Sequence, residues 1–318
     1  MKTFCTIITP DYLPYAKVLY TSLAKYDSSI TLQVMITGKN ATDEYLINHP
    51  GIHLYYPENI FNYELVQEIY KKYAHQNIDN FRWALKPVFI SYLLDKGFEK
   101  VLYTDCDIYF FNDYAFLFTE LNTASILLTP HWRNSDPLID EESFFSLFKD
   151  GIFNAGFIGA NKNGIPALQW WAKVCHFKME ANPLQGIYDD QRYLDVLPVK
   201  FEDVKIIRNR GCNIGAWNEE ECKRILVNGV VLINKEYPII FIHFNNMLMQ
   251  QILKGHDALL LPYLTEFKES FEINGSHLFD FMKSMDYYLN ANIFIRLKWK
   301  LLIRTRLKRL LVRLADAL

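Results

Sequence analysis

The order of strand-like and helix-like segments is the feature that most constrains how this chain can fold. The strand-like runs over the first 130 residues are 4–9, 31–37, 100–103 and 124–129. The helix-like stretches between them are 14–24, 60–73 and 83–94. Such alternation is typical of a mostly parallel sheet with helices on both faces. We therefore predict an α/β fold with a mixed, mostly parallel central sheet, which the later apolar runs at 157–160, 230–233 and 239–244 extend or flank.

Composition excludes several classes of protein. The 318 residues are 50% hydrophobic and 22% charged, so disordered and collagen-like architectures are excluded. No apolar run of about twenty residues predicts a membrane-spanning helix. The formal net charge of −2 provides no general attraction for nucleic acid, so no nucleic-acid partner is expected. The first residues lack the pattern of a secretory signal, and five cysteines without a CxxC pair fit a reduced, cytoplasmic protein.

The C-terminal region differs in charge from the rest of the chain. Residues 296–313 contain eight Lys or Arg residues and no acid, which leaves 26 basic and 36 acidic residues elsewhere, a formal charge of about −10. Apolar residues from Trp299 to Leu314 recur at steps of three or four, which predicts an amphipathic helix. No linker or repeat divides the chain, so we predict one main domain at 1–255 and a helical region at 256–318.

The sharpest local feature is a pair of carboxylates at the end of a buried-type strand. Val101, Leu102 and Tyr103 lead directly into Asp105 and Asp107. Sheets of the predicted type bind ligands beyond the carboxyl ends of their strands. Two acids placed there repel each other unless a divalent cation lies between them, and oxygen ligands suit Mg²⁺ or Mn²⁺. The alternative is a pair of solvated turn acids.

A phosphatase of the haloacid-dehalogenase type also places Asp-x-Asp after a hydrophobic strand. In that class the first aspartate is the nucleophile, the motif lies near the N-terminus, and small hydroxyl or glycine residues follow it. Here Ile108, Tyr109 and Phe110 follow, and the motif lies a third of the way along the chain. The pattern therefore departs from that class.

Several short segments, in their order and spacing, resemble the nucleotide-sugar glycosyltransferases of the GT-A fold. The similarity is to bacterial polysaccharide glycosyltransferases and to the lipooligosaccharide-galactosyltransferase and glycogenin group, and it extends from about Thr3 to Asn246. The segments that carry it are Thr9-Pro10-Asp11-Tyr12, Ala84-Leu85-Lys86-Pro87, Asp105-Cys106-Asp107, Leu128-Thr129-Pro130-His131, Asn154-Ala155-Gly156, Asp189-Asp190-Gln191, 211–218 and Ile242-His243-Phe244.

The resemblance implies a cation bound by Asp105, Asp107 and His243. An imidazole ligand favours Mn²⁺ over Mg²⁺. The alternative for His243 is a hydrogen-bonded histidine at a strand end. The lysine that binds the diphosphate in the galactosyltransferase group has no visible equivalent after His243, although Lys254 could replace it.

The resemblance also implies where the nucleotide and the sugar bind. Tyr12 would stack on a uracil-sized base, and Thr9 or Asp11 would hydrogen-bond it. Either Arg82 or Lys86 would offset the phosphate charge. The sugar-binding and catalytic residues would be Asn154, Asp190 and Gln191, with Asp190 on the sugar hydroxyls and Gln191 beneath the anomeric carbon. The alternative for each is a structural role.

The expected function is metal-dependent transfer of a sugar from a nucleotide diphosphate, such as UDP, to a glycan or lipid-linked acceptor in polysaccharide synthesis. Retention of configuration is expected. An inverting enzyme would instead need a carboxylate base, such as Asp189 or Asp136. A non-catalytic, membrane-bound nucleotide- or sugar-binding protein is the other alternative. The basic helix would attach the protein to the anionic inner face of the cell membrane.

Overall fold

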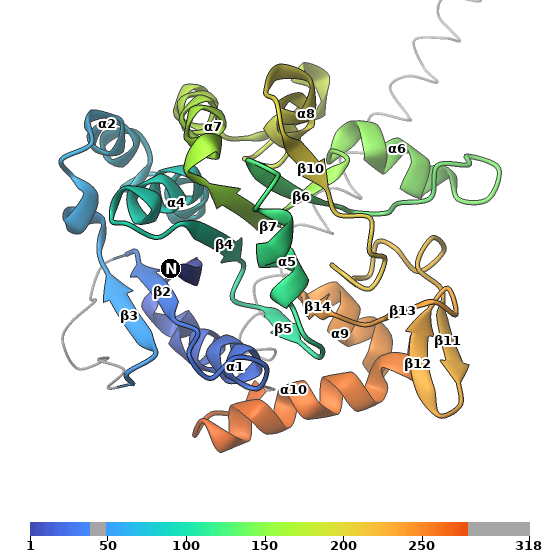
Figure 1. Ribbon diagram of the computed structural model, residues 1–318. Coiled ribbons are helices and arrows are strands. Elements are labelled where there is room, and N and C mark those ends of the chain that lie inside the picture. Colours follow the sequence, from blue (N-terminus) through green and yellow to red (C-terminus); the bar gives the residue numbers. More distant parts are fainter. Residues whose placement is uncertain (39–48, 279–318) are drawn as a thin grey trace, which may run out of the picture. The chain divides into compact units, whose positions relative to one another are not determined.

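The computed structural model describes residues 1–38 and 49–278 (Figure 1). A seven-stranded sheet lies at its centre, with the strand order β10-β6-β7-β4-β1-β2-β3. All neighbouring strands pair in parallel except β7, which is antiparallel to both β4 and β6. The predicted α/β fold with a mixed, mostly parallel sheet is therefore confirmed. The strands are β1 (Lys2–Ile8), β2 (Leu32–Ile36), β3 (Ile52–Tyr55), β4 (Lys100–Thr104), β6 (Ile126–Pro130), β7 (Phe153–Asn161) and β10 (Val204–Ile206).

The central strands are apolar because helices cover both of their faces. One face packs against α2 (Glu64–Tyr73), α3 (Ile78–Ala84), α4 (Lys86–Asp95) and α7 (Ile165–Phe177). Cys5 and Tyr103, which pair across β1 and β4, contribute to this core. The opposite face carries aromatic contacts, in which the ring of Phe4 lies 5.4 Å from Phe110 and 4.9 Å from Tyr114. Helices α1 (Leu13–Ala24) and α5 (Ala115–Glu120) follow β1 and β5.

Two predicted helices differ from expectation, in one case because of a proline. The predicted helix at 83–94 is divided into α3 and α4 at Leu85, and Pro87 occupies the first turn of α4. A proline lacks the N–H that a helix interior needs, so a new helix starts there. The predicted helix at 60–73 is a short 3₁₀ turn, Pro57–Ile60, followed by α2.

Two of the later apolar runs lie outside the central sheet. Strand β12 (Val230–Ile233) forms a three-stranded antiparallel sheet with β11 (Arg224–Val227) and β13 (Tyr237–Pro238). Strand β14 (Phe241–His243) pairs with β5 (Ile108–Phe110). The run at 157–160 belongs to β7, which begins earlier than predicted. A further two-stranded pair joins β8 (Ala181–Asn182) and β9 (Ile187–Tyr188).

Four further α-helices belong to the described part of the chain. They are α6 (Glu141–Lys149), α8 (Leu197–Lys200), α9 (Asn246–Leu253) and α10 (Leu261–Ile273). Within the described ranges, no helix combines the length and the hydropathy needed to cross a bilayer. All five cysteines are buried and unpaired.

Residue contacts divide the chain into two compact units, Met1–Ser270 and Phe271–Leu318. Of the second unit, the structure describes the end of α10 and the short stretch that follows it, to residue 278. The predicted basic helix at 299–314 lies outside the described residues.

Candidate functional site

Strand pairing brings the three predicted metal ligands together although 138 positions separate Asp105 from His243. Asp105 follows β4, and Asp107 immediately precedes β5. The antiparallel ladder between β5 and β14 places His243 opposite Ile108. The backbone N–H of Phe244 also donates to the carbonyl of Asp107 at 2.8 Å. The ladder thus sets the imidazole beside the carboxylates.

The geometry of these three side chains suits a divalent cation. Nε2 of His243 lies 3.0 Å from Oδ1 of Asp107, and one potential ligand atom from each of Asp105, Asp107 and His243 lies within 4.8 Å of the others. Nδ1 of His243 is buried and has no hydrogen-bond partner. Two carboxylates and an imidazole are a donor set that Mn²⁺ accepts. The residues therefore fit the implied ion.

Gly156 leaves the space that this set requires. A Cβ atom at Gly156 would lie 2.7 Å from Oδ1 of Asn154, 2.7 Å from Cε1 of His243 and 2.9 Å from Oδ2 of Asp105. The carbonyl of Gly156 also accepts a hydrogen bond from the backbone N–H of Asp105 at 2.8 Å. Strand β7 therefore forms the floor beneath the carboxylate and the imidazole, and a side chain at this position would fill the site.

Lys86 is a buried cation between two carboxylates. Its Nζ lies 3.1 Å from Oδ2 of Asp190 and 3.4 Å from Oδ1 of Asp105, and it donates to the carbonyl of Ala155 at 3.1 Å. The side chain is at the first turn of α4, where the helix dipole disfavours a positive charge. The two carboxylates compensate for that unfavourable position. Lys86 thereby links the predicted metal ligand Asp105 to the predicted sugar ligand Asp190.

Burial and neighbouring charges shift the pKa values of Lys86, Asp105 and Asp190. Burial lowers the pKa of Lys86, but the charges of Asp105 and Asp190 outweigh burial and raise it. Burial opposes ionisation of Asp105, yet Lys86 and His243 hold its pKa below the ordinary value. For Asp190 burial prevails over the attraction of Lys86, so its pKa is raised.

The predicted catalytic amides are both held by the backbone. Oδ1 of Asn154 accepts from the backbone N–H of Gly156 at 2.5 Å. Gln191 accepts from the N–H of Ala155 at 3.3 Å and donates to the carbonyl of Asp150 at 2.8 Å. Both ends of Gln191 are therefore fixed, so its orientation in the site is determined by β7 and by Asp150.

Asp189 and Asp190 lie in a turn between β9 and the 3₁₀ helix Arg192–Val196. Asp189 has a φ of +45°, a conformation that costs other side chains energy but that Asp and Asn adopt more readily. The carbonyl of Asp190 accepts from Nε1 of Trp171 at 2.9 Å, so the indole N–H of this buried tryptophan has a hydrogen-bond partner. Burial and the nearby Asp190 raise the pKa of Asp189 to about 6.

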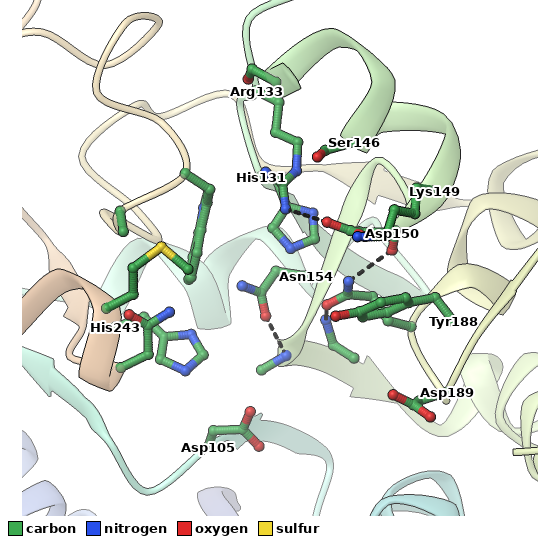
Figure 2. Close-up of a pocket in the computed structure, with 18 of the residues that line it drawn as sticks. Asp105, His131, Arg133, Ser146, Lys149, Asp150, Asn154, Tyr188, Asp189 and His243 are labelled. Carbon is green, nitrogen blue, oxygen red and sulfur yellow. Dashed lines mark hydrogen bonds and ion pairs between the residues drawn. The ribbon is translucent and has the colours of Figure 1, made fainter. Parts of the chain in front are cut away.

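Most of these residues, although not Asp107 or Trp171, line a cleft of about 810 Å³ (Figure 2). Figure 2 shows Asp105 and His243 toward one end of the view, with Arg133, Ser146 and Lys149 toward the other. The lining side chains include three cations, Lys86, Arg133 and Lys149. They also include six carboxylates: Asp105, Asp140, Glu142, Asp150, Asp189 and Asp190. The excess of negative charge is what a bound cation would compensate.

The sequence analysis did not single out Arg133 and Asp150 of this cleft, and it named Trp217 only as part of the segment 211–218. Arg133 forms an ion pair with Asp150 at 2.7 Å, and Asp150 is the residue whose carbonyl holds Gln191. Arg133 follows the end of β6, which is the same signal that identified Asp105 after β4. It could have been found by that rule.

Trp217 stands edge-on to two histidines of the cleft. Its ring centroid lies 5.4 Å from that of His131 and 5.4 Å from that of His243. Burial and Arg133 lower the pKa of His131 to about 3, so this ring is neutral. Arg224 holds the loop that carries Trp217, because it donates to the carbonyl of Gly215 at 2.9 Å and pairs with buried Asp257 at 3.0 Å.

The predicted nucleotide ligands lie beside the end of β1, outside the lining of the cleft just described. Thr9 hydrogen-bonds Asp11. The guanidinium of Arg82 lies 5.7 Å from the ring centroid of Tyr12 and pairs with Asp79 at 2.9 Å. Arg82 and Lys86 thus occupy different places, one beside Tyr12 and the other in the cleft.

Two further predicted candidates are exposed, and neither is among the residues that line the cleft. Asp136 accepts from the N–H of Leu138 at 2.9 Å. Lys254 follows the end of α9.

The chain has relatives of known sequence. It is 30% identical over 250 residues to the uncharacterized protein YfnD of Bacillus subtilis. This alignment covers 76% of this chain and 76% of YfnD. It is also 26% identical over 305 residues to the uncharacterized protein YfnF of the same organism, covering 91% of this chain and 97% of YfnF. No protein-family profile matches the chain. The chain belongs to the family of YfnD.

The fold also resembles solved structures. The galactosyltransferase LgtC aligns over 76% of this chain and 86% of its own, with 18% identity and a TM-score of 0.46. Mouse xyloside xylosyltransferase 1 aligns over 77% of this chain and 98% of its own, with 13% identity and a TM-score of 0.46. The bifunctional glycosyltransferase WbbM aligns over 76% of this chain and 45% of its own, with 13% identity and a TM-score of 0.47. All three of these proteins are named as glycosyltransferases.

Proposed function

We propose that this protein is a glycosyltransferase that moves a sugar from a nucleotide-diphosphate donor to a saccharide acceptor. The observation that carries the proposal is the cluster of Asp105, Asp107 and His243 at the carboxyl end of β4, beside the pair of Lys86 and Asp190. Ligands of α/β sheets bind at this end of the strands. A cation site can bind a diphosphate, and the hydrogen-bonding side chains beside it can bind the sugar that is joined to that diphosphate.

Asp105, Asp107 and His243 would hold Mn²⁺ or Mg²⁺. When bound, the cation would supply charge stabilisation for the diphosphate as the bond to the sugar breaks. Lys86 would hold Asp105 and Asp190 in place, because it pairs with both. Asp190 and Asn154 would orient the hydroxyl groups of the sugar.

The nucleotide base would lie at the end of β1. Tyr12 offers an aromatic face, and Thr9 and Asp11 offer short polar groups, which together suit a uracil-sized ring. Arg82 lies on the same side, beside Tyr12. A UDP-sugar is therefore the donor class that we favour.

Retention of configuration is the stereochemical outcome that we favour, with Gln191 beneath the anomeric carbon. Its side-chain amide makes two hydrogen bonds to the backbone, which would hold it in place beneath the reacting carbon during transfer. One observation favours inversion instead: Asp189 lines the cleft with a pKa raised to about 6, a value suited to a general base. NMR of the product's anomeric proton separates the two outcomes, because an inverted linkage would assign the base to Asp189.

The proposal is tested first by ligand binding. Thermal shifts with UDP, GDP, CDP and their sugar conjugates, each with Mn²⁺, Mg²⁺ or EDTA, should show stabilisation by one nucleotide that depends on the metal. Release of nucleoside diphosphate from the matching sugar donor then shows turnover. A phosphatase would release phosphate from simple phosphate esters instead. A binding protein without catalysis would be stabilised without release.

We also propose that residues 296–313 attach the enzyme to anionic membranes. The proposal rests on the eight basic residues of that segment, in contrast to the net acidic remainder of the chain. Full-length protein should bind anionic vesicles in a salt-sensitive manner, and protein cut after residue 290 should not. Equal binding of the two forms would contradict the proposal.

A further inference from the structure

Helix α6 turns its polar side to the cleft and exposes two phenylalanines, Phe145 and Phe148, to solvent. Glu142, Ser143, Ser146 and Lys149 line the cleft. Of the nine residues of α6, only Ser143 is buried. A helix in a globular protein ordinarily buries its apolar stripe against the core. In α6, Phe144 and Leu147 are half-buried but Phe145 and Phe148 remain exposed, so this part of its apolar side is available to a ligand.

Exposed and half-buried apolar side chains gather on and beside α6, and we call this set the α6 face. Phe145 and Phe148 are 58% and 60% exposed, and Leu138 is 94% exposed. The ring of Phe144 joins them, with centroids 5.7 Å from Phe145 and 5.2 Å from Phe148. Exposed apolar patches of this kind mark binding surfaces. The α6 face consists of Leu138, Ile139, Phe144, Phe145, Phe148 and Ile152.

The α6 face borders the mouth of the cleft. Glu142 and Lys149 both line the cleft and are exposed to solvent, so they mark its rim. Phe145 and Phe148 lie on the same helix, between those two rim residues in the sequence. A molecule whose reacting end occupies the cleft and whose other end leaves past this rim therefore passes over the α6 face.

We propose that the α6 face binds the hydrocarbon chain of the acceptor, whose sugar lies in the cleft; this inference rests on the proposed function. The acceptor class is an alkyl or polyprenyl glycoside. Its two ends match the two sides of α6, because the sugar hydroxyls meet Ser143, Ser146 and Glu142 while the chain meets Phe145 and Phe148. An amphipathic ligand is the partner that fits a helix with this orientation.

Charge argues against the surface of an anionic bilayer as the direct occupant. Four acids, Asp136, Asp140, Glu141 and Glu142, surround the N-terminal end of α6 next to Leu138 and Ile139. An anionic leaflet would repel these acids. A neutral hydrocarbon chain beside a neutral sugar meets no such repulsion.

The test compares acceptors that share one sugar but differ in aglycone. Methyl and decyl β-glucosides and β-galactosides are offered in monomeric solution with donor and Mn²⁺, and kcat/KM for transfer is measured. We expect the wild type to prefer the decyl glycoside by about tenfold or more, as burial of a few methylenes would give. The double variant Phe145→Ser/Phe148→Ser should lose this preference.

Phe177→Ser is the matched control, because Phe177 is 73% exposed at the end of α7 and is not among the residues that line the cleft. It should keep the preference for the decyl glycoside. Hydrolysis of the donor without acceptor should be equal in all three proteins, which shows that the substitutions leave the catalytic end of the cleft intact.

A second readout does not depend on turnover. A decyl β-glucoside with a diazirine on its chain should label residues 138–152, and the double variant should not be labelled there. Labelling elsewhere, or an unchanged decyl preference in the double variant, overturns the proposal. Self-association that the double variant loses, without any alkyl preference, would assign the α6 face to a second copy. Absence of donor turnover in the wild type overturns the proposed function, whereas the label still reports whether this face binds hydrocarbon.

Discussion

Lys86 Nζ lies 3.1 Å from Oδ2 of Asp190 in a part of the cleft where both side chains are buried. The same nitrogen lies 3.4 Å from Oδ1 of Asp105. One cation thus joins the helix α4, the end of β4 and the turn before the 3₁₀ helix at 192–196. The pairing fixes the distance between the carboxylate that would bind metal and the carboxylate that would bind sugar.

Removal of this cation should destabilise the fold. Lys86→Met leaves the buried carboxylate of Asp190 without its cation, and removing one partner of a buried ion pair costs about 3–5 kcal/mol. The Lys86→Met/Asp190→Asn double variant should recover part of the loss, since that buried charge is then absent. Chemical denaturation of the metal-free proteins measures both. Unchanged stability of Lys86→Met would show that the pair is solvated in solution.

Gly156→Ala should abolish metal binding with little effect on the rest of the fold. The added Cβ would lie within 3 Å of Asn154, His243 and Asp105, so the ligands must move apart. Gly159→Ala is the control on the same strand, because its Cβ would meet only apolar side chains of Leu102 and Leu127 at 2.9–3.0 Å. The control should lower Tm yet bind Mn²⁺ normally in titration calorimetry. Normal binding by Gly156→Ala would contradict the assigned site.

Asp189 should make stability and activity depend on pH near 6. Its pKa is raised to about 6 by burial and by Asp190. A raised carboxyl pKa stabilises the fold fully below the unfolded-state pKa, and that contribution is lost as pH rises through 6. Asp189→Asn should therefore gain Tm relative to the wild type at pH 7.5 but not at pH 4.5. Asn also tolerates the φ of +45° at this position. An equal Tm difference at both pH values would refute this pKa assignment.

Arg133 should act on turnover through Gln191. It pairs with Asp150, whose carbonyl accepts from Gln191 at 2.8 Å. Arg133→Met should lower kcat by about tenfold while KM for the donor stays within twofold, because orientation rather than donor binding is lost. Lys149→Met is the control, since Lys149 lies 3.6 Å from Asp150 and is more exposed. A rise in KM with unchanged kcat would place Arg133 on the donor instead.

The sequence predicted the central sheet and the carboxylate pair because both depend on local pattern. Strands β1, β2 and β4 are short apolar runs, and the position of Asp105 at the end of such a run follows from the same pattern. Strand β3 was missed, although its four residues follow Gly51 as a short alternating run. Its exposed and half-buried positions give it a weaker apolar signal than β1 or β2.

Contacts between distant parts of the chain could not be predicted from periodicity. The ladder that sets His243 beside Asp107 joins β5 to β14, and only the resemblance pointed to it. Asp150 acts through its backbone carbonyl, for which the sequence carries no side-chain signal. The exposure of Phe145 and Phe148 was also unpredictable, because an amphipathic pattern indicates an apolar side but not whether anything covers it.

The most direct test of the metal-dependent mechanism is the rate of nucleoside diphosphate release from the matching donor sugar in Mn²⁺ and in EDTA. The wild type should turn over only with the metal, and His243→Ala should need more Mn²⁺ to reach its maximum rate. Asp107→Asn should remain folded, with turnover lowered by at least about a hundredfold. Equal release in EDTA and Mn²⁺, or full activity of Asp107→Asn, would contradict the account.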